Sequence, residues 1–173
     1  MEPEEYCRKW VPIYQDKKPG ERGYRAACIR ELARVSGVKG TTIDINWGSD
    51  FSERPSYLPK MLALAHTINL MKQMFSQAPG TFKDEIMFEP MEPKDFCAKW
   101  VPRKSNFKPG EYGYRKECCE FLASLTGYNE DTCSNWLSTP SDVPKLARMY
   151  FRLLDTVWEI DKLLPKNVNN FKE

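Results

Sequence analysis

The feature that most constrains this chain is an internal repeat: residues 1–37 align without a gap with residues 91–127. Nineteen of these 37 positions carry identical residues, among them a shared tryptophan, a Lys-Pro-Gly-Glu turn and a Gly-Tyr-Arg step. After a one-residue shift, Asn46-Trp47 also aligns with Asn135-Trp136. A tandem repeat of this kind predicts that one structural unit is built twice in the same chain.

The repeat predicts how the 173 residues are organised. We expect a first helical repeat over 1–77, a linker over 78–90, a second helical repeat over 91–164 and a polar tail over 165–173. The linker opens with Ala78-Pro79-Gly80, and its turn-forming residues without apolar periodicity are typical of a connection between domains. Each repeat of about 75 residues is long enough to bury a small core of its own.

Apolar residues recur at helical spacing in both repeats, and few segments alternate as strands do. The predicted fold class is therefore all-α, with two tandem homologous four-helix domains. The expected helices are 3–11, 21–36, 41–47 and 56–76 in the first repeat, and 93–101, 111–126, 129–137 and 142–164 in the second. Pro12 and Pro102 are expected to stop the first helix of each repeat, and Gly37 and Gly127 to close the second.

Charge and hydropathy narrow the classes of function. The chain has 26 Lys and Arg against 24 Asp and Glu, a net charge of +2, so binding to nucleic acid requires a local basic face. No apolar run approaches the roughly 18 residues of a membrane span, and a membrane partner is not expected. The first residues show no secretory signal, so we expect a cytoplasmic protein whose six cysteines are reduced.

Motifs for catalysis and for metal binding are not found, so we expect neither enzyme activity nor a cofactor. The sequence contains no phosphate-cradling glycine loop, no nucleophile elbow and no metal-binding histidine pair. His66 is the single histidine and no Cys-x-x-Cys pair occurs, so no metal site is predicted. The two shared cysteines, Cys7 and Cys28 in the first repeat, are interpreted as buried thiols. Cys118 and Cys119 are adjacent on one helix, so one of them is expected to be exposed.

Residues 121–137 carry the most specific pattern. Ala123 is small enough for two helices to cross closely, and Gly127, four residues later, suits a tight turn that needs a left-handed backbone. Cys133 and Trp136 are three residues apart and can pack a short helix onto the body. This stretch resembles the helix-turn-helix of repressor-type DNA-binding proteins.

The first repeat carries the same pattern less completely. Ala33 and Gly37 fit, but aligning Trp47 with Trp136 indicates one extra residue in 38–41 that lengthens the turn. The same alignment places Asp44 opposite the buried Cys133. Either the register shifts so that Ile43 packs in place of Asp44, or this copy has lost the pattern.

The resemblance implies that the third helix of each repeat enters the major groove of DNA. It implies base contacts from the outer faces of these helices: Lys39, Thr41, Thr42, Ile45 and Asn46 in the first repeat, and Asn129, Ser134 and Asn135 in the second. Asn46 and Asn135 coincide in the alignment, and an asparagine can make two hydrogen bonds to adenine. Phosphate contacts are expected from the cations that the two repeats share: Lys18, Arg25, Lys60, Lys108, Arg115 and Lys145.

Two functions from different classes remain open. The first is a regulatory protein, acting on transcription, that binds double-stranded DNA as a built-in pseudo-dimer on an asymmetric site. The alternative is a helical adaptor that binds a protein partner through its acidic third helices or the apolar edge of its fourth helices. Glu130 and Asp131, at the start of one third helix, and the near-zero net charge favour the adaptor. For Arg25 and Arg115, pairing with a carboxylate of their own domain remains an alternative to phosphate contact. A continuous positive face would favour DNA.

Overall fold

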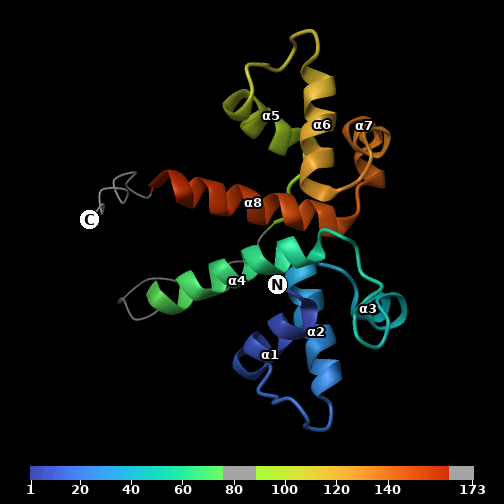
Figure 1. Ribbon diagram of the computed structural model, residues 1–173, viewed down its shortest axis with the longest axis vertical. Helices are drawn as coiled ribbons and strands as arrows, with labels where there is room; N and C mark the ends of the chain where they lie inside the picture. The colour runs from blue at the N-terminus through green and yellow to red at the C-terminus, as the bar shows by residue number, and fades with distance from the viewer. Residues whose placement is uncertain (76–88, 164–173) are drawn as a thin grey trace, which may run out of the picture.

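The computed structural model describes residues 1–75 and 89–163, and it confirms the all-α fold class for them (Figure 1). The N-terminal half, residues 1–75, consists of α1 (Pro3–Tyr14), α2 (Tyr24–Ser36), α3 (Gly40–Asn46) and α4 (Leu58–Phe75). The C-terminal half, residues 89–163, consists of α5 (Pro93–Lys104), α6 (Tyr114–Thr126), α7 (Glu130–Ser138), the 3-10 turn η1 (Pro140–Asp142) and α8 (Lys145–Leu163). The predicted tail and all of the predicted linker except Glu89 and Pro90 lie outside the described residues.

None of the helices in the two described ranges has the length and apolarity that crossing a membrane requires.

The first helix of each half does not stop at its proline, as was expected. α1 continues past Pro12 to Tyr14, and α5 continues past Pro102 to Lys104. A proline removes the hydrogen bond to the residue four positions earlier and crowds that residue's carbonyl group, and the residues concerned, Arg8 and Ala98, are exposed. Water can therefore satisfy their carbonyl groups. The buried side chains that precede the prolines keep the backbone in the helix.

The second helix of each half begins three residues later than expected. Gly23 and Gly113 directly precede α2 and α6 and have φ angles of +86° and +87°. This left-handed conformation interrupts the helical backbone and is accessible to glycine at little cost. The shared Lys-Pro-Gly-Glu turn therefore remains a loop in both halves, and each helix starts at the tyrosine that follows.

Each half buries the inner faces of its helices against one another. α1 packs on α2 and α4, and α2 packs on α3; in the same way α5 packs on α6 and α8, and α6 packs on α7. Trp10 and Trp100, at equivalent positions, are both buried. Cys118 and Cys119 are also both buried, so the expectation that one would be exposed is wrong. Cys119 faces α7, where its thiol hydrogen-bonds Ser134.

The core of the N-terminal half contains a polar network. The Glu31 side chain is fully buried and accepts two hydrogen bonds from Arg34, at 2.9 and 2.7 Å. Tyr6 donates its hydroxyl to Glu31 at 3.4 Å and accepts from the Asn69 amide at 3.1 Å. The Tyr14 hydroxyl donates to the Asn69 side-chain oxygen at 3.2 Å, which closes the network at the edge of the core.

The C-terminal half fills the same place with aromatic rings. Phe96 and Phe121 stand at the positions of Tyr6 and Glu31, and their rings stack with centroids 5.9 Å apart. Phe151 and Trp158 of α8 complete the cluster, at 5.1 and 5.6 Å from Phe96. The two repeats therefore share a backbone arrangement, but α1 is held by a buried polar network, whereas α5 is held by packed aromatic rings.

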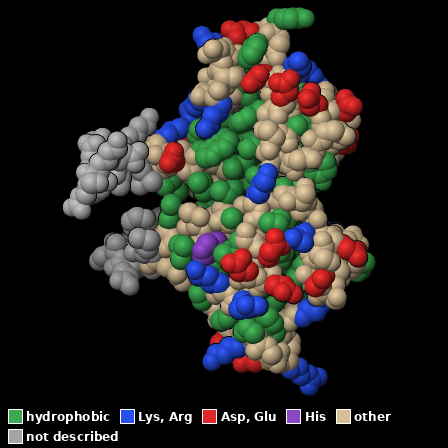
Figure 2. Space-filling view, in the orientation of Figure 1, with side chains coloured by type: hydrophobic (Ala, Val, Ile, Leu, Met, Phe, Trp, Pro, Cys, Tyr) green, Lys and Arg blue, Asp and Glu red, His purple; other side chains and the backbone are tan. Residues whose placement is uncertain are grey.

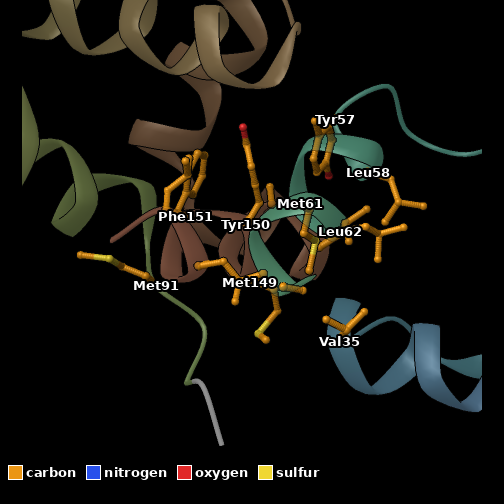
Figure 3. Close-up of a cluster of buried hydrophobic side chains, with 14 of the residues drawn as sticks. Val35, Tyr57, Leu58, Met61, Leu62, Met91, Met149, Tyr150 and Phe151 are labelled. Carbon is orange, nitrogen blue, oxygen red and sulfur yellow. The ribbon is translucent and has the colours of Figure 1, made fainter. Parts of the chain in front are cut away.

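The two halves meet through their long helices, and their buried apolar side chains form one continuous cluster. α4 packs against α8, and α2 also reaches α8. The rings of Tyr57 and Tyr150 lie 5.6 Å apart at this interface. Figure 3 shows Met61 and Leu62 of α4 facing the α8 side chains, with Val35 of α2 nearby.

The start of each long helix also lies on the helix–helix turn of the other half. Ser56, just before α4, donates to the carbonyl of Thr126, and Lys60 donates to the carbonyl of Leu125. In return, Lys145 and Met149 of α8 lie against Gly37, so closely that a Cβ atom there would be 3.1 Å from each side chain. The contact between the halves is thus reciprocal and includes both turns.

Candidate nucleic-acid interface

The two turns that connect α2 to α3 and α6 to α7 are built in the same way. Gly37 and Gly127 have φ angles of +68° and +78°, and their N–H groups donate to the carbonyls of Ala33 and Ala123 at 2.9 and 2.7 Å. The residue before each glycine is buried, and its hydroxyl accepts a hydrogen bond from the backbone N–H two residues later. Ser36 accepts from Val38 at 3.2 Å, and Thr126 accepts from Tyr128 at 3.3 Å. These local bonds fix the direction in which the next helix leaves.

The turn of the first repeat is not lengthened, which corrects the expectation of an extra residue in 38–41. α3 starts three residues after Gly37, and α7 starts three residues after Gly127. Ile43 and Cys133 then occupy the same place, and neither is accessible to solvent. Of the two alternatives left open, the structure therefore has Ile43 in the core and Asp44 exposed. The extra residue lies between Ile43 and Trp47, which follows the last residue of α3.

This register changes which residues on α3 and α7 correspond. Counted from the helix starts, Asn135 matches Ile45, not Asn46, so the two asparagines do not coincide as the alignment indicated. The Ile45 side chain is 77% exposed, although it is a large apolar residue. The outer face of α3 therefore presents an aliphatic side chain where α7 presents an amide.

Arg25, predicted to contact phosphate, is held by its own half. Its guanidinium pairs with Asp44 of α3 at 3.1 Å and donates to the carbonyl of Gly48 at 3.2 Å and to that of Ser49. It also stacks on Phe51, 5.0 Å from the ring centroid. Arg25 thus fastens the end of α3 to the start of α2 and adds positive charge where the helix carbonyls end.

Arg115 does the same in the C-terminal half with different partners. It donates to the backbone carbonyl of Ser134 at 2.9 Å, to the Ser134 hydroxyl at 3.1 Å and to the Ser138 hydroxyl at 2.5 Å. Two residues of the predicted DNA site, Arg115 and Ser134, are therefore brought together, but they bind each other. The outer edges of both arginine side chains remain exposed.

The shared lysines fall into two groups. Lys18 and Lys108 lie exposed in the loops before α2 and α6, where their backbone N–H groups donate to Glu21 and Glu111. Lys60 and Lys145 begin the long helices and lie at the contact between the halves, beside the turns at Leu125 and Gly37. Lys39 is exposed and directly precedes α3, next to the candidate reading face.

The remaining predicted contact residues are on or beside α3 and α7. Thr41, Asn46 and Asn135 are exposed, and Thr42 is half-buried. Asn129 caps α7, because its side-chain oxygen accepts the Thr132 N–H at 2.8 Å. That oxygen is already bonded, which leaves the Asn129 amide nitrogen as a donor.

An open groove of about 480 Å³ runs between the starts of α6 and α7. Its walls combine cations, carboxylates and an exposed tyrosine, and they consist of Tyr112, Gly113, Arg115, Lys116, Cys119, Glu130, Asp131 and Ser134. Burial raises the pKa of the Cys119 thiol, which lines this groove. In the N-terminal half the corresponding position holds the larger Ile29, beside Gly40.

α3 and α7 lie on the same side of the molecule, opposite the far ends of α4 and α8 (Figure 1). The face in Figure 2 shows Lys and Arg side chains interspersed with Asp and Glu, and acidic groups gather over the upper right of the C-terminal half. In residues 1–75 and 89–163, no cluster of three or more His, Cys, Asp or Glu side chains could hold a metal ion.

Sequence reasoning left pairing of Arg25 with a carboxylate of its own domain open, but it did not identify the partner of either arginine. Asp44 and Ser134 each stand 19 residues after the arginine that they bind, and this equal spacing within both repeats was the available signal. Ser138, the last residue of α7, and Phe51, which lies beyond the end of α3, gave no such signal, because the two repeats differ in length and composition there.

Comparison of the chain with protein-family models, with curated proteins and with solved structures finds no match.

Proposed function

We propose that this protein is a regulatory, double-stranded-DNA-binding protein of the cytoplasm, in which two homologous four-helix domains act as an intramolecular pseudo-dimer. The observation that carries the proposal is the pair of helices α3 and α7. Each follows a glycine turn of the same length, each is anchored by a buried residue at the same register, Ile43 or Cys133, and each leaves its outer face exposed. Both helices lie on one side of the molecule (Figure 1).

The differing outer faces imply an asymmetric target. The Ile45 side chain suits apolar contact with a thymine methyl group, whereas Asn135 at the matching register suits the paired acceptor and donor of adenine. Thr41 beside Ile45, and Ser134 beside Asn135, extend these two surfaces. A duplex with two identical half-sites would match one helix better than the other.

The direct test is fluorescence anisotropy of a labelled random duplex titrated with the full chain over a series of salt concentrations. A DNA-binding protein retains an electrostatic, sequence-independent affinity that falls as salt rises. We expect a linear decrease of log affinity with log salt. Replacing the exposed Lys39 with Gln should reduce the slope by roughly 1, as expected for the loss of one phosphate contact. No binding at low salt would exclude the proposal.

Sequence preference is tested separately by selection from a random duplex pool. Ile45→Ala and Asn135→Ala should each relax the preference at one base position and leave affinity for random duplex nearly unchanged. The matched control is Lys108→Gln, in an exposed loop before α6, which should leave the preferred sequence intact. Circular dichroism of each variant establishes that the helices are retained.

A second candidate function is a protein-binding adaptor. It is favoured because several of the cations shared by the two repeats are bound to acceptors within the chain. Arg25, Arg115 and Lys60 all donate to acceptors within the chain, and Glu130 and Asp131 at the start of α7 would face the phosphates. The groove between α6 and α7 then becomes the candidate docking surface. Absence of salt-dependent DNA binding, together with loss of a stable co-purifying partner on Glu130→Lys, would support this function over the first.

A further inference from the structure

We propose that the C-terminal parts of α5 and α8 form a docking site for an acidic segment of a partner protein. A side-chain carboxylate of that segment binds between Lys99, Arg103 and Lys162, in place of the chain's own Glu159. The inference is independent of DNA binding, since α5 and the end of α8 lie on the other side of the C-terminal half from α7 (Figure 1).

Three cations from two helices meet at one carboxylate oxygen. Glu159 Oε1 pairs with the ammonium groups of Lys99 at 2.9 Å and Lys162 at 2.8 Å, and with the Arg103 guanidinium at 3.2 Å. The hydrogen bonds from Lys162 and Lys99 lower the pKa of Glu159 to about 2, so the group is a carboxylate at neutral pH. Its side chain is 40% exposed. The cluster therefore binds a carboxylate at a place that solvent can reach.

Two tryptophans position these cations. The rings of Trp100 and Trp158 pack edge to face, with centroids 4.8 Å apart. The Lys162 ammonium lies 4.3 Å and the Arg103 guanidinium 5.1 Å from the Trp100 centroid, and Lys104 adds a fourth cation 4.9 Å from that of Trp158. Cation–π contacts of this kind hold long side chains near one geometry. A ligand that binds them loses less side-chain freedom than it would on an unordered surface.

The fold itself does not require these charges, because the N-terminal half packs the same helices without them. The equivalent tryptophan of each half donates its indole N–H to the long helix, to His66 in α4 and to Asp155 in α8. By this register, Leu70 stands at the position of the central glutamate, and the sequence repeat places Ile13 at that of the central arginine. The charged cluster is thus a feature of the C-terminal half alone, beyond what the shared packing needs.

The arrangement favours a single carboxylate over a nucleic-acid backbone. Successive phosphates require a track of cations along the strand, whereas Lys99, Arg103 and Lys162 converge on one point. Asp155 lies directly behind, 2.5 Å from the Lys99 ammonium, and adds a second negative charge that would repel a polyanion. Arginine and lysine donors together suit the two oxygens of a carboxylate. Exposed ion pairs contribute little to stability, so an incoming carboxylate can exchange with Glu159 at small cost.

The test uses a fluorescein-labelled hexaglutamate peptide, titrated with the full chain at low salt and followed by fluorescence anisotropy. Glu159→Gln removes the competing carboxylate and should tighten binding about fivefold. Arg103→Gln should weaken it by a similar factor. Two controls match these changes in net charge: Glu120→Gln, in a surface pair with Lys116, and Arg30→Gln, on the exposed side of α2. Each control should change the affinity by less than twofold.

A measurement on the wild-type chain needs no variant. Backbone and indole N–H chemical shifts, recorded during the same peptide titration, should move at the C-terminal parts of α5 and α8 and at Trp100. They should not move at α7. This mapping decides the matter if Arg103→Gln fails to fold, which circular dichroism would reveal.

Several results would overturn the proposal. One is binding that Glu159→Gln leaves unchanged or weakens. Another is a loss of affinity in Arg103→Gln no greater than in Arg30→Gln, which would reduce the effect to overall charge. Shifts confined to α7 would place the peptide elsewhere. Displacement of the bound peptide by an equal concentration of duplex DNA, with the same dependence on Arg103, would assign the site to nucleic acid instead.

Discussion

The ammonium group of Lys60 donates to the carbonyl oxygen of Leu125, 3.4 Å away, and joins the start of α4 to the end of α6 in the other half. Its counterpart Lys145 lies beside Gly37 at the end of α2. Both lysines are therefore placed where the carbonyl end of a helix concentrates partial negative charge. This reciprocal contact fixes the position of α3 relative to α7, which a linker alone would not fix.

The two turn glycines should respond unequally to substitution. Alanine at either position is strained by the positive φ, which costs about 1–2 kcal/mol. At Gly37 the new Cβ would also lie 3.1 Å from side chains of Lys145 and Met149, whereas at Gly127 its nearest neighbour would be the Ser56 hydroxyl at 3.5 Å. We expect Gly37→Ala to destabilise the protein by about 1 kcal/mol more than Gly127→Ala, because overpacking adds to the strain. Urea denaturation measures both, and equal losses would contradict a contact between the halves at Gly37.

Arg25 should contribute to stability, in contrast to an exposed loop lysine. Arg25→Ala removes the ion pair to Asp44 and the hydrogen bonds to the carbonyls after α3, and we expect a loss of about 1 kcal/mol in the free energy of unfolding. Lys18→Ala, in the loop before α2, should change it by less than about 0.5 kcal/mol. Chemical denaturation of the two variants makes the comparison, which fails if Arg25→Ala is as neutral as the control.

Stability should decrease in mildly acidic solution because of His66. Its Nδ1 accepts a hydrogen bond from the Trp10 indole at 3.1 Å, and burial, followed by the charge of Lys9, holds the pKa of His66 below its ordinary value of 6.5. The folded state thus favours neutral histidine. This stability is fully present above pH 6.5 and is lost as the pH falls from there through the depressed pKa.

His66→Phe is the matched variant for this pH dependence. Phenylalanine cannot accept the Trp10 hydrogen bond, so the variant should be less stable at neutral pH. The part of the decrease in the free energy of unfolding that begins as the pH falls below 6.5 through the depressed pKa of His66 should be absent from the variant. Denaturation curves at several pH values give the result. An unchanged slope would assign the pH dependence to another group.

The buried carboxylate of the N-terminal half should be far more costly to remove than an exposed one. Glu31→Ala leaves Arg34 and the Tyr6 hydroxyl without their acceptor, and we expect a loss of about 2–4 kcal/mol, since Arg34 keeps some contact with water. Glu120→Ala breaks only a surface pair to Lys116 and should cost less than about 1 kcal/mol. Thermal unfolding would show the difference directly, and similar melting temperatures would argue against the network.

Several elements could be predicted from residues alone because their causes are local. Gly37 and Gly127 closed the second helices as expected, since a left-handed backbone is a property of the glycine itself. The ends of the first helices could not be predicted from Pro12 and Pro102. There the packing of the neighbouring valines outweighed the local preference of the residue before proline to leave the helix.

The amino-acid sequence by itself determined the repeat, the all-helical class and the two glycine turns, because identity and helical periodicity are readable along one dimension. Only the tertiary structure decided the register of α3, in which Ile43 is buried and Ile45 stands opposite Asn135. It also decided that Arg25 and Arg115 bind their own helices and that Lys60 and Lys145 lie between the halves. The sequence gives the identity of a charged residue but not its contacts, because its partners come within reach only when distant helices pack together.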